Sequence, residues 1–137
     1  MREQKKRHGL YTMEFVDPNL IMIRAFDSWN LEQTEAFCEE LNENFVSHIE
    51  HAPWGFVADI SQWGLCPPEA MARFNQLAED LGNRNERFLA VISHTNIQGS
   101  LAKEYVNHAG NILTTRYFKD ANEGIQWCRE QLGRGHT

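Results

Sequence analysis

Two short segments near the start of the chain, residues 10–16 and 20–26, contain apolar residues that alternate with polar ones or follow one another directly. The second, Leu20-Ile-Met-Ile-Arg-Ala-Phe26, is rich in β-branched residues, which favour strands. Asp17-Pro18-Asn19 lies between them, and these residue types are typical of tight turns. Because the connection is so short, the pattern predicts an antiparallel hairpin.

Helical periodicity follows the hairpin. Asn30, with Gln33 three residues later, resembles a capping box and predicts the start of a helix. An apolar residue then recurs at every fourth position, as on the buried face of an amphipathic helix: Phe37, Leu41, Phe45 and Ile49. Pro53 predicts the end of this segment.

Strands and helices alternate through the rest of the chain. We expect strands at 55–61, 87–93 and 112–118, helices at 67–82, 101–109 and 121–132, and polar loops at 62–66 and 94–99. Alternation of this kind predicts right-handed crossovers and a parallel sheet between helices. The expected fold is therefore a single α/β domain of order ββαβαβαβα, with a mostly parallel mixed sheet, an N-terminal antiparallel hairpin and flanking helices.

A domain at residues 10–132 accounts for most of the 137 residues. Residues 1–9 are predicted to be a flexible basic N-terminus and residues 133–137 a disordered tail. The net charge of −6 argues against nucleic acid and anionic membranes as main partners. No apolar run approaches the roughly 20 residues of a membrane-spanning helix.

Three cysteines occur without a close pair or a CxxC motif: Cys38, Cys66 and Cys128. An odd, unpatterned set fits reduced thiols better than a disulfide framework. We therefore expect a cytoplasmic protein.

Four segments together resemble the STAS-like domains, and within them the SpoIIAA-like proteins of bacteria. Val57-Ala-Asp-Ile-Ser61 is similar to the family's strand ending in Asp-Leu-Ser, which a loop and a helix follow. The other three are Arg87-Phe-Leu-Ala-Val-Ile92, Arg116-Tyr-Phe118 and Gly124-Ile-Gln-Trp-Cys128. The resemblance spans about residues 10–132 and implies a regulatory domain that acts by binding.

One segment departs from the family's pattern. The anti-sigma-factor antagonists of this family are switched by phosphorylation of a serine at the start of the helix after the Asp-Leu-Ser strand. Here that segment reads Gly64-Leu-Cys-Pro-Pro-Glu69, without serine or threonine. A phosphoserine switch, and with it a role in sigma-factor regulation, is therefore not expected.

Polar and aromatic residues follow two neighbouring strands of the predicted sheet. In α/β folds the carboxyl ends of parallel strands are the usual place for a ligand. The sequence therefore predicts a small cleft for a ligand or partner, lined by Ser61, Gln62, Trp63 and Cys66 on one side and by His94, Thr95 and Asn96 on the other.

Two residues are candidates for catalysis. Cys66 precedes a helix, and a helix N-terminus can lower a thiol pKa, although only His94 is placed to serve as its base. Asp59 lies in a buried strand, where a carboxylate can act as an acid or base or simply accept hydrogen bonds. His48 and His51 lack the third ligand that a zinc site needs, so neither a metal nor a cofactor is expected.

Three functions remain open at this point. The leading hypothesis is a non-enzymatic binding or regulatory domain that contacts an unknown partner through residues 61–71. The alternatives are a carrier of a small apolar, lipid-like ligand and an enzyme with a reactive Cys66. Trp29, Trp54 and Trp63, all expected in loops, are predicted to cover the ends of the core or to line a pocket. The exposed edge of the hairpin suggests a homodimer.

Overall fold

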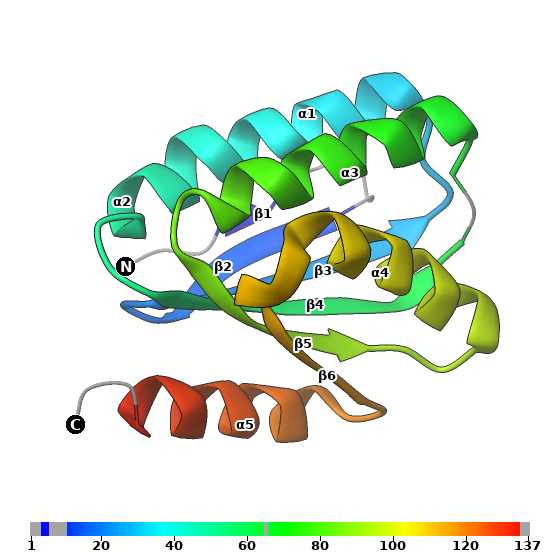
Figure 1. Cartoon of the computed structure of the whole chain (residues 1–137). Coiled ribbons are helices and arrows are strands. Elements are labelled where there is room, and N and C mark those ends of the chain that lie inside the picture. Colours follow the sequence, from blue (N-terminus) through cyan, green and yellow to red (C-terminus); the bar gives the residue numbers. More distant parts are fainter. Residues whose placement is uncertain (1–3, 6–10, 65, 135–137) are drawn as a thin grey trace.

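A six-stranded sheet with helices on both faces forms the centre of the molecule, in a computed structural model that describes residues 4–5, 11–64 and 66–134 (Figure 1). The strands follow one another across the sheet in chain order: β1 (Gln4–Lys5), β2 (Tyr11–Asp17), β3 (Leu20–Asp27), β4 (Trp54–Trp63), β5 (Glu86–Ile92) and β6 (Thr114–Phe118). The first three pair antiparallel, and β3 to β6 pair parallel. The α/β fold with its opening hairpin is confirmed.

The helices divide unequally between the two faces. They are α1 (Leu31–Leu41), a π-helical segment (Asn42–Val46), α2 (Ser47–Ile49), α3 (Pro68–Gly82), α4 (Asn96–Ala109), a 3-10 turn (Gly110–Ile112) and α5 (Ala121–Arg134). Every right-handed crossover steps in the same direction, so α1, α3 and α4 share one face of the sheet. Helix α5 follows the last strand and is the only described helix on the other face (Figure 1).

Two apolar cores result from this arrangement. The larger lies under α1, α3 and α4 and contains fully buried residues such as Trp54, Leu41 and Leu77. The smaller lies under α5 and joins strand residues such as Met22 and Val57 to Trp127. Gly124 lets α5 approach the sheet, because a Cβ at this position would lie 2.8 Å from Ile92 Cδ1.

The π-helical segment has a cause in the sequence. Four residues of an α-helix cover about 400°, so a stripe with a spacing of exactly four turns away from the sheet by about 40° at each step. The i→i+5 bonds of a π-helix put more residues into each turn and take up this drift. Phe37, Leu41, Phe45 and Ile49 accordingly all remain buried.

Several predicted boundaries were wrong. Strand β4 continues to Trp63 and includes Gln62, where a loop was expected, and α4 begins at Asn96 rather than after Gly99. The segment from Gly110 to Ile112 is a 3-10 turn, so the last strand starts at Thr114. The early start of α4 follows from a capping box in which the Thr95 side chain caps the N–H of Gln98.

Trp29, Trp54 and Trp63 were all expected in loops. All three are buried, and two of them belong to a strand instead. Trp54 and Trp63 are the first and last residues of β4, and Trp29 lies between β3 and α1. They therefore cover the two ends of the larger core, which is one of the roles expected for them.

The chain ends lie only partly within the described residues. Of the predicted flexible segment 1–9, Gln4–Lys5 pair with Met13 and Thr12 of β2, and the other residues lie outside the described ranges. Helix α5 continues to Arg134, two residues into the predicted tail, and residues 135–137 lie outside.

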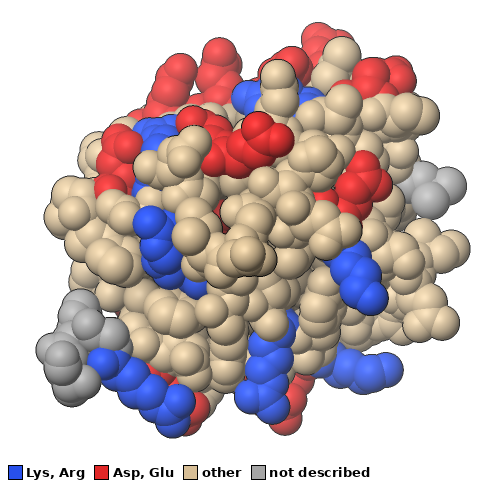
Figure 2. All heavy atoms as spheres, viewed as in Figure 1, with Lys and Arg blue, Asp and Glu red and all other residues tan. Residues whose placement is uncertain are grey.

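The charges are unevenly distributed over the surface. Figure 2 shows acidic side chains gathered over α1 and α3, on the three-helix side of the sheet. Helix α1 contains four glutamates and no lysine or arginine. In the described part of the chain, no helix combines the length and the apolar character needed to cross a bilayer.

Candidate functional site

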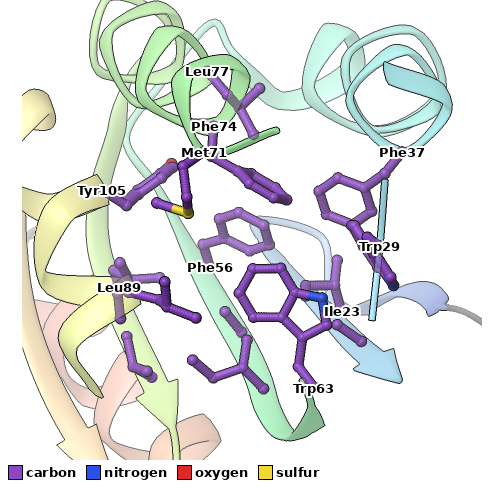
Figure 3. A pocket seen from close by; sticks show the side chains of 16 residues that line it. Ile23, Trp29, Phe37, Phe56, Trp63, Met71, Phe74, Leu77, Leu89 and Tyr105 are labelled. Carbon is purple, nitrogen blue, oxygen red and sulfur yellow. The ribbon is translucent and has the colours of Figure 1, made fainter. Parts of the chain in front are cut away.

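An apolar cavity of about 90 Å³ lies between the sheet and the three helices that share its face (Figure 3). Strands β3, β4 and β5 form its floor, and α1, α3 and α4 its walls. Sixteen residues line it: Ile23, Ala25, Trp29, Phe37, Phe56, Ala58, Ile60, Trp63, Met71, Phe74, Leu77, Leu89, Val91, Leu101, Ala102 and Tyr105.

Small residues create this space and leave it open to solvent. Ala58 lies in the middle of the central strand β4, on the face that three helices cover, yet it is only half-buried. Leu101 and Ala102 on α4 are also half-buried and line the same cavity. Partial exposure at the centre of a covered sheet face indicates an opening beside α4.

Aromatic rings build one wall of the cavity. The centroid of Trp29 lies 5.0 Å from that of Phe37, 5.6 Å from that of Trp63 and 5.9 Å from that of Phe74. Trp29 is itself fixed by a 3.0 Å hydrogen bond from its Nε1 to the Phe26 carbonyl. Tilted and edge-to-face contacts of this kind hold the rings in place and give the wall a defined shape.

Two polar side chains reach the cavity from its lining. The Tyr105 hydroxyl donates a 2.9 Å hydrogen bond to Glu86 Oε1, at the base of β5. Burial and this carboxyl raise the pKa of Tyr105 well above its usual value. Trp63 Nε1 is buried and has no hydrogen-bond acceptor among the described residues. The other lining side chains are apolar, which suits the cavity to an apolar ligand.

Gln98 occupies the place between the two segments where the sequence predicted a cleft. Its Nε2 donates to the carbonyls of Ser61 and Trp63, at 3.1 Å each. Its Oε1 accepts from the N–H groups of His94 and Thr95, at 2.8 and 3.2 Å. The predicted segments do lie side by side, but this buried amide bridges them. The capping-box spacing from Thr95 to Gln98 was the sequence signal for it.

The seven predicted site residues therefore do not share one hollow. Trp63 lines the apolar cavity and Cys66 packs beside the larger core. His94 points elsewhere, since its Nε2 lies 3.0 Å from the Lys119 carbonyl. Gln62, Thr95 and Asn96 do not line the cavity either, and Thr95 caps α4.

Ser61 and Asp59 belong to the opposite face of the sheet. Asp59 follows Val57 by two residues and pairs with Arg24 and Ile92, of which Val57 and Ile92 pack under α5. Its Oδ1 accepts from the Ser61 Oγ at 2.6 Å and from the Ser61 N–H at 3.0 Å. Arg24 Nε lies 3.7 Å from its Oδ2. These contacts stabilise the irregular end of β4, where the register with β3 shifts.

Solved structures share this arrangement, whereas no family model and no curated protein matches the sequence. An uncharacterized protein of the DUF3478 family from Shewanella loihica PV-4, with a SpoIIAA-like fold, superimposes with a TM-score of 0.67 at 14% identity. The match covers 87% of this chain and 93% of that one. The anti-sigma factor antagonist SpoIIAA, in its unphosphorylated form, gives 0.63 at 10% identity, over 87% and 97% of the two chains.

This chain has a SpoIIAA-like fold. The resemblance seen in its sequence is thereby supported at the level of structure. In this SpoIIAA-like chain, α3 starts at Pro68 after an N-cap at Pro67 that makes no side-chain capping bond. Glu69 contributes a negative charge to the first turn.

Cys66 lies just before this helix, but its surroundings do not activate it. Burial and, to a smaller extent, the charge of Glu104 raise the pKa of the Cys66 thiol to about 11. A thiol with this pKa is almost entirely protonated at neutral pH, and the thiolate is the nucleophile. Burial likewise raises the pKa values of Cys38 and Cys128 to about 12.

His48 and His51 have a spacing that could suit a pair of metal ligands. Over the described residues, no group of three or more histidine, cysteine, aspartate or glutamate side chains is placed to hold an ion. His48 and His51 therefore have no third ligand near them within that part of the chain.

Proposed function

We propose that this chain is a non-enzymatic binding domain that takes up a small apolar ligand in the cavity between its sheet and α1, α3 and α4. The open, apolar cavity at the centre of the larger core carries this proposal. Protein interiors normally contain few voids, and the cost of an empty apolar space rises with its volume. A cavity that remains open beside two half-buried residues of α4 is better explained by an occupant.

The size of the cavity limits the ligand. An engineered apolar cavity of roughly 150 Å³ accommodates benzene, whereas this one measures about 90 Å³. The enclosed part of the ligand is therefore smaller than a benzene-sized guest, and an aromatic ring enters with part of it in the opening. Anything larger extends through the opening beside Ala102.

Two observations favour binding over catalysis. The Cys66 thiol is protonated at neutral pH because its pKa is raised to about 11. Asp59 is engaged by Ser61 and Arg24 on the far side of the sheet from the cavity. Neither candidate for catalysis lines the space in which a small apolar molecule would lie.

Filling the cavity tests the proposal. Toluene is the probe, and its binding is followed by shifts of amide and indole signals in ¹H–¹⁵N NMR spectra. We expect Ala102→Leu and Ala58→Leu to weaken binding at least tenfold, because the added atoms occupy the site. Of the two variants, Ala102→Leu is expected to disturb folding less, because Ala102 is half-buried at the opening of the cavity.

Ala121→Leu is the matched control, because Ala121 packs beside the smaller core under α5. It should bind toluene as the unmodified protein does. If toluene binds both cavity variants as tightly as it binds the unmodified protein, the binding site lies elsewhere and the proposal is overturned.

A regulatory protein partner is the second candidate, favoured by the likeness to the antagonist SpoIIAA. The candidate surface is the exposed part of the described residues between 61 and 71, namely Gln62, Pro68 and Glu69, next to the acidic side chains over α1 and α3 (Figure 2). A basic partner fits this charge, and because residues 64–69 contain no serine or threonine we expect no phosphoserine switch in that segment.

Charge reversal tests this second candidate. A partner retained from bacterial lysate by the immobilised protein should be lost with Glu69→Lys and kept with Glu123→Lys, a reversal in the first turn of α5. Recovery of the chain alone, or equal retention by the two variants, would contradict it. The homodimer stays a prediction, which sedimentation at micromolar concentration decides.

A further inference from the structure

One polar atom in the lining of the cavity lacks a partner. Trp63 is 8% exposed, and its Nε1 is buried without a hydrogen-bond acceptor among the described residues. In Figure 3 this nitrogen lies on the edge of the indole that is turned toward Ile23 and Trp29, two other residues of the lining. Buried donors are paired in the great majority of cases, so an unpaired one calls for an explanation.

The other tryptophans of the larger core show what is missing. Trp29 Nε1 donates to the Phe26 carbonyl at 3.0 Å, and Trp54 Nε1 donates to the Arg84 carbonyl at 2.8 Å. The rings nearest to Trp63 are those of Trp29 and Phe74, at 73° and 86° to its plane. An aromatic face is a much weaker acceptor than an oxygen. Of these three tryptophans, only Trp63 has an indole N–H without an acceptor among the described residues, and it also lines the cavity.

The other polar groups of the lining, Trp29 Nε1 and the Tyr105 hydroxyl, already donate hydrogen bonds. The Tyr105 hydroxyl donates to Glu86, which lies outside the lining. Among the residues that the structure describes, no lysine, arginine, aspartate or glutamate belongs to the lining. A charged group placed in this cavity would therefore lose its hydration without gaining a partner, which is strongly unfavourable. The inserted part of a ligand must be neutral.

We propose that the ligand is a small neutral aromatic compound with one hydrogen-bond acceptor, and that Trp63 Nε1–H donates to this acceptor. The inference rests on the proposed function, because it assumes that the cavity is a ligand site. The tilted rings of Trp29, Phe37 and Phe74 offer an aromatic guest the offset and edge contacts that such rings prefer. The single free donor fixes the orientation of the guest.

A matched pair of probes tests the proposal. Acetophenone carries a carbonyl oxygen, and α-methylstyrene has the same shape with a methylene group in its place. Because α-methylstyrene is the more apolar, an apolar site without a donor binds it more tightly. We expect the unmodified protein to prefer acetophenone and Trp63→Phe to reverse this preference, with the ratio of the two dissociation constants changing by about fivefold, as one net hydrogen bond would give.

The NMR signal of the Trp63 indole proton supplies a readout that does not depend on a variant. Acetophenone should move this one indole signal downfield far more than α-methylstyrene does. Trp127→Phe, which changes a tryptophan of α5 in the smaller core, is the control variant and should leave the preference unchanged.

The outcomes separate this inference from the proposed function. If toluene binds in the cavity but the unmodified protein prefers α-methylstyrene, or if the Trp63 indole signal responds alike to both probes, the donor role falls and the apolar site stands. If neither toluene nor the two probes bind, both proposals fall. An acetophenone preference that survives in Trp63→Phe would also overturn the inference.

Discussion

Replacing Trp54 with alanine is expected to lower the free energy of unfolding by about 3–5 kcal/mol, the usual cost of removing a fully buried large aromatic side chain. Trp54 is completely buried at the start of β4. Its Nε1 donates to the Arg84 carbonyl at 2.8 Å, and its backbone N–H donates to the Asn85 carbonyl at 3.0 Å. The side chain therefore joins β4 to the connection between α3 and β5.

Urea unfolding followed by circular dichroism measures this effect, and Trp54→Phe is the matched control. Phenylalanine keeps most of the ring but loses the bond to Arg84, so it should cost less than alanine by at least about 1 kcal/mol. A loss below about 1 kcal/mol for alanine would show that this end of the core is not packed as described.

Glu86 should make the protein less stable as the pH rises. Its side chain is completely buried, and burial raises its pKa to about 8, against the smaller opposing effects of the Tyr105 hydroxyl and the Arg87 charge. Below about pH 4.5 the carboxyl is protonated in both folded and unfolded chains and contributes no pH dependence. Between that pH and about 8 only the unfolded chain ionises, so stability falls by up to about 1.4 kcal/mol per pH unit.

Glu86→Gln removes this dependence, because an amide does not titrate and still accepts from Tyr105. Relative to the unmodified protein, the variant should gain stability between pH 5 and pH 8 by about 3 kcal/mol or more. Chemical denaturation at the two pH values measures the gain. Tyr105→Phe, which leaves the carboxyl buried, should keep the decline with pH. Parallel pH profiles for Glu86→Gln and the unmodified protein would contradict the buried, protonated carboxyl.

The fold could be predicted from the sequence because short, local residue patterns indicate its strands, helices and turns. The turn residues at 17–19 and the continuous apolar run after Gly55 predict a hairpin and an interior parallel strand, and the structure has both. The π-helix was missed, although its signal was the spacing itself. A stripe at intervals of exactly four cannot stay on one face of a regular α-helix, and Phe37 to Ile49 show that interval.

The candidate site was harder to predict from the sequence, because side chains far apart in the chain form it. Trp63 was singled out, but as part of a polar cleft at the end of the strand. The spacing from Thr95 to Gln98 indicates a capping box, but no local pattern indicates that the same amide reaches the carbonyls of β4 or that Ala58 and Ala102 leave room beneath α4. Such a space arises where small residues of several elements happen to face one another, and no single segment shows it.

The single cover on one face of the sheet has a consequence for biosynthesis. Helix α5 is the last described element to be synthesised, and it alone shields Leu20, Met22, Val57, Ala90 and Ile92. The residues that line the cavity lie between Ile23 and Tyr105 and are all synthesised before α5, so this part of the fold can begin to form first. Until α5 docks, the chain presents a bare apolar sheet face, which is exposed to association with other apolar surfaces.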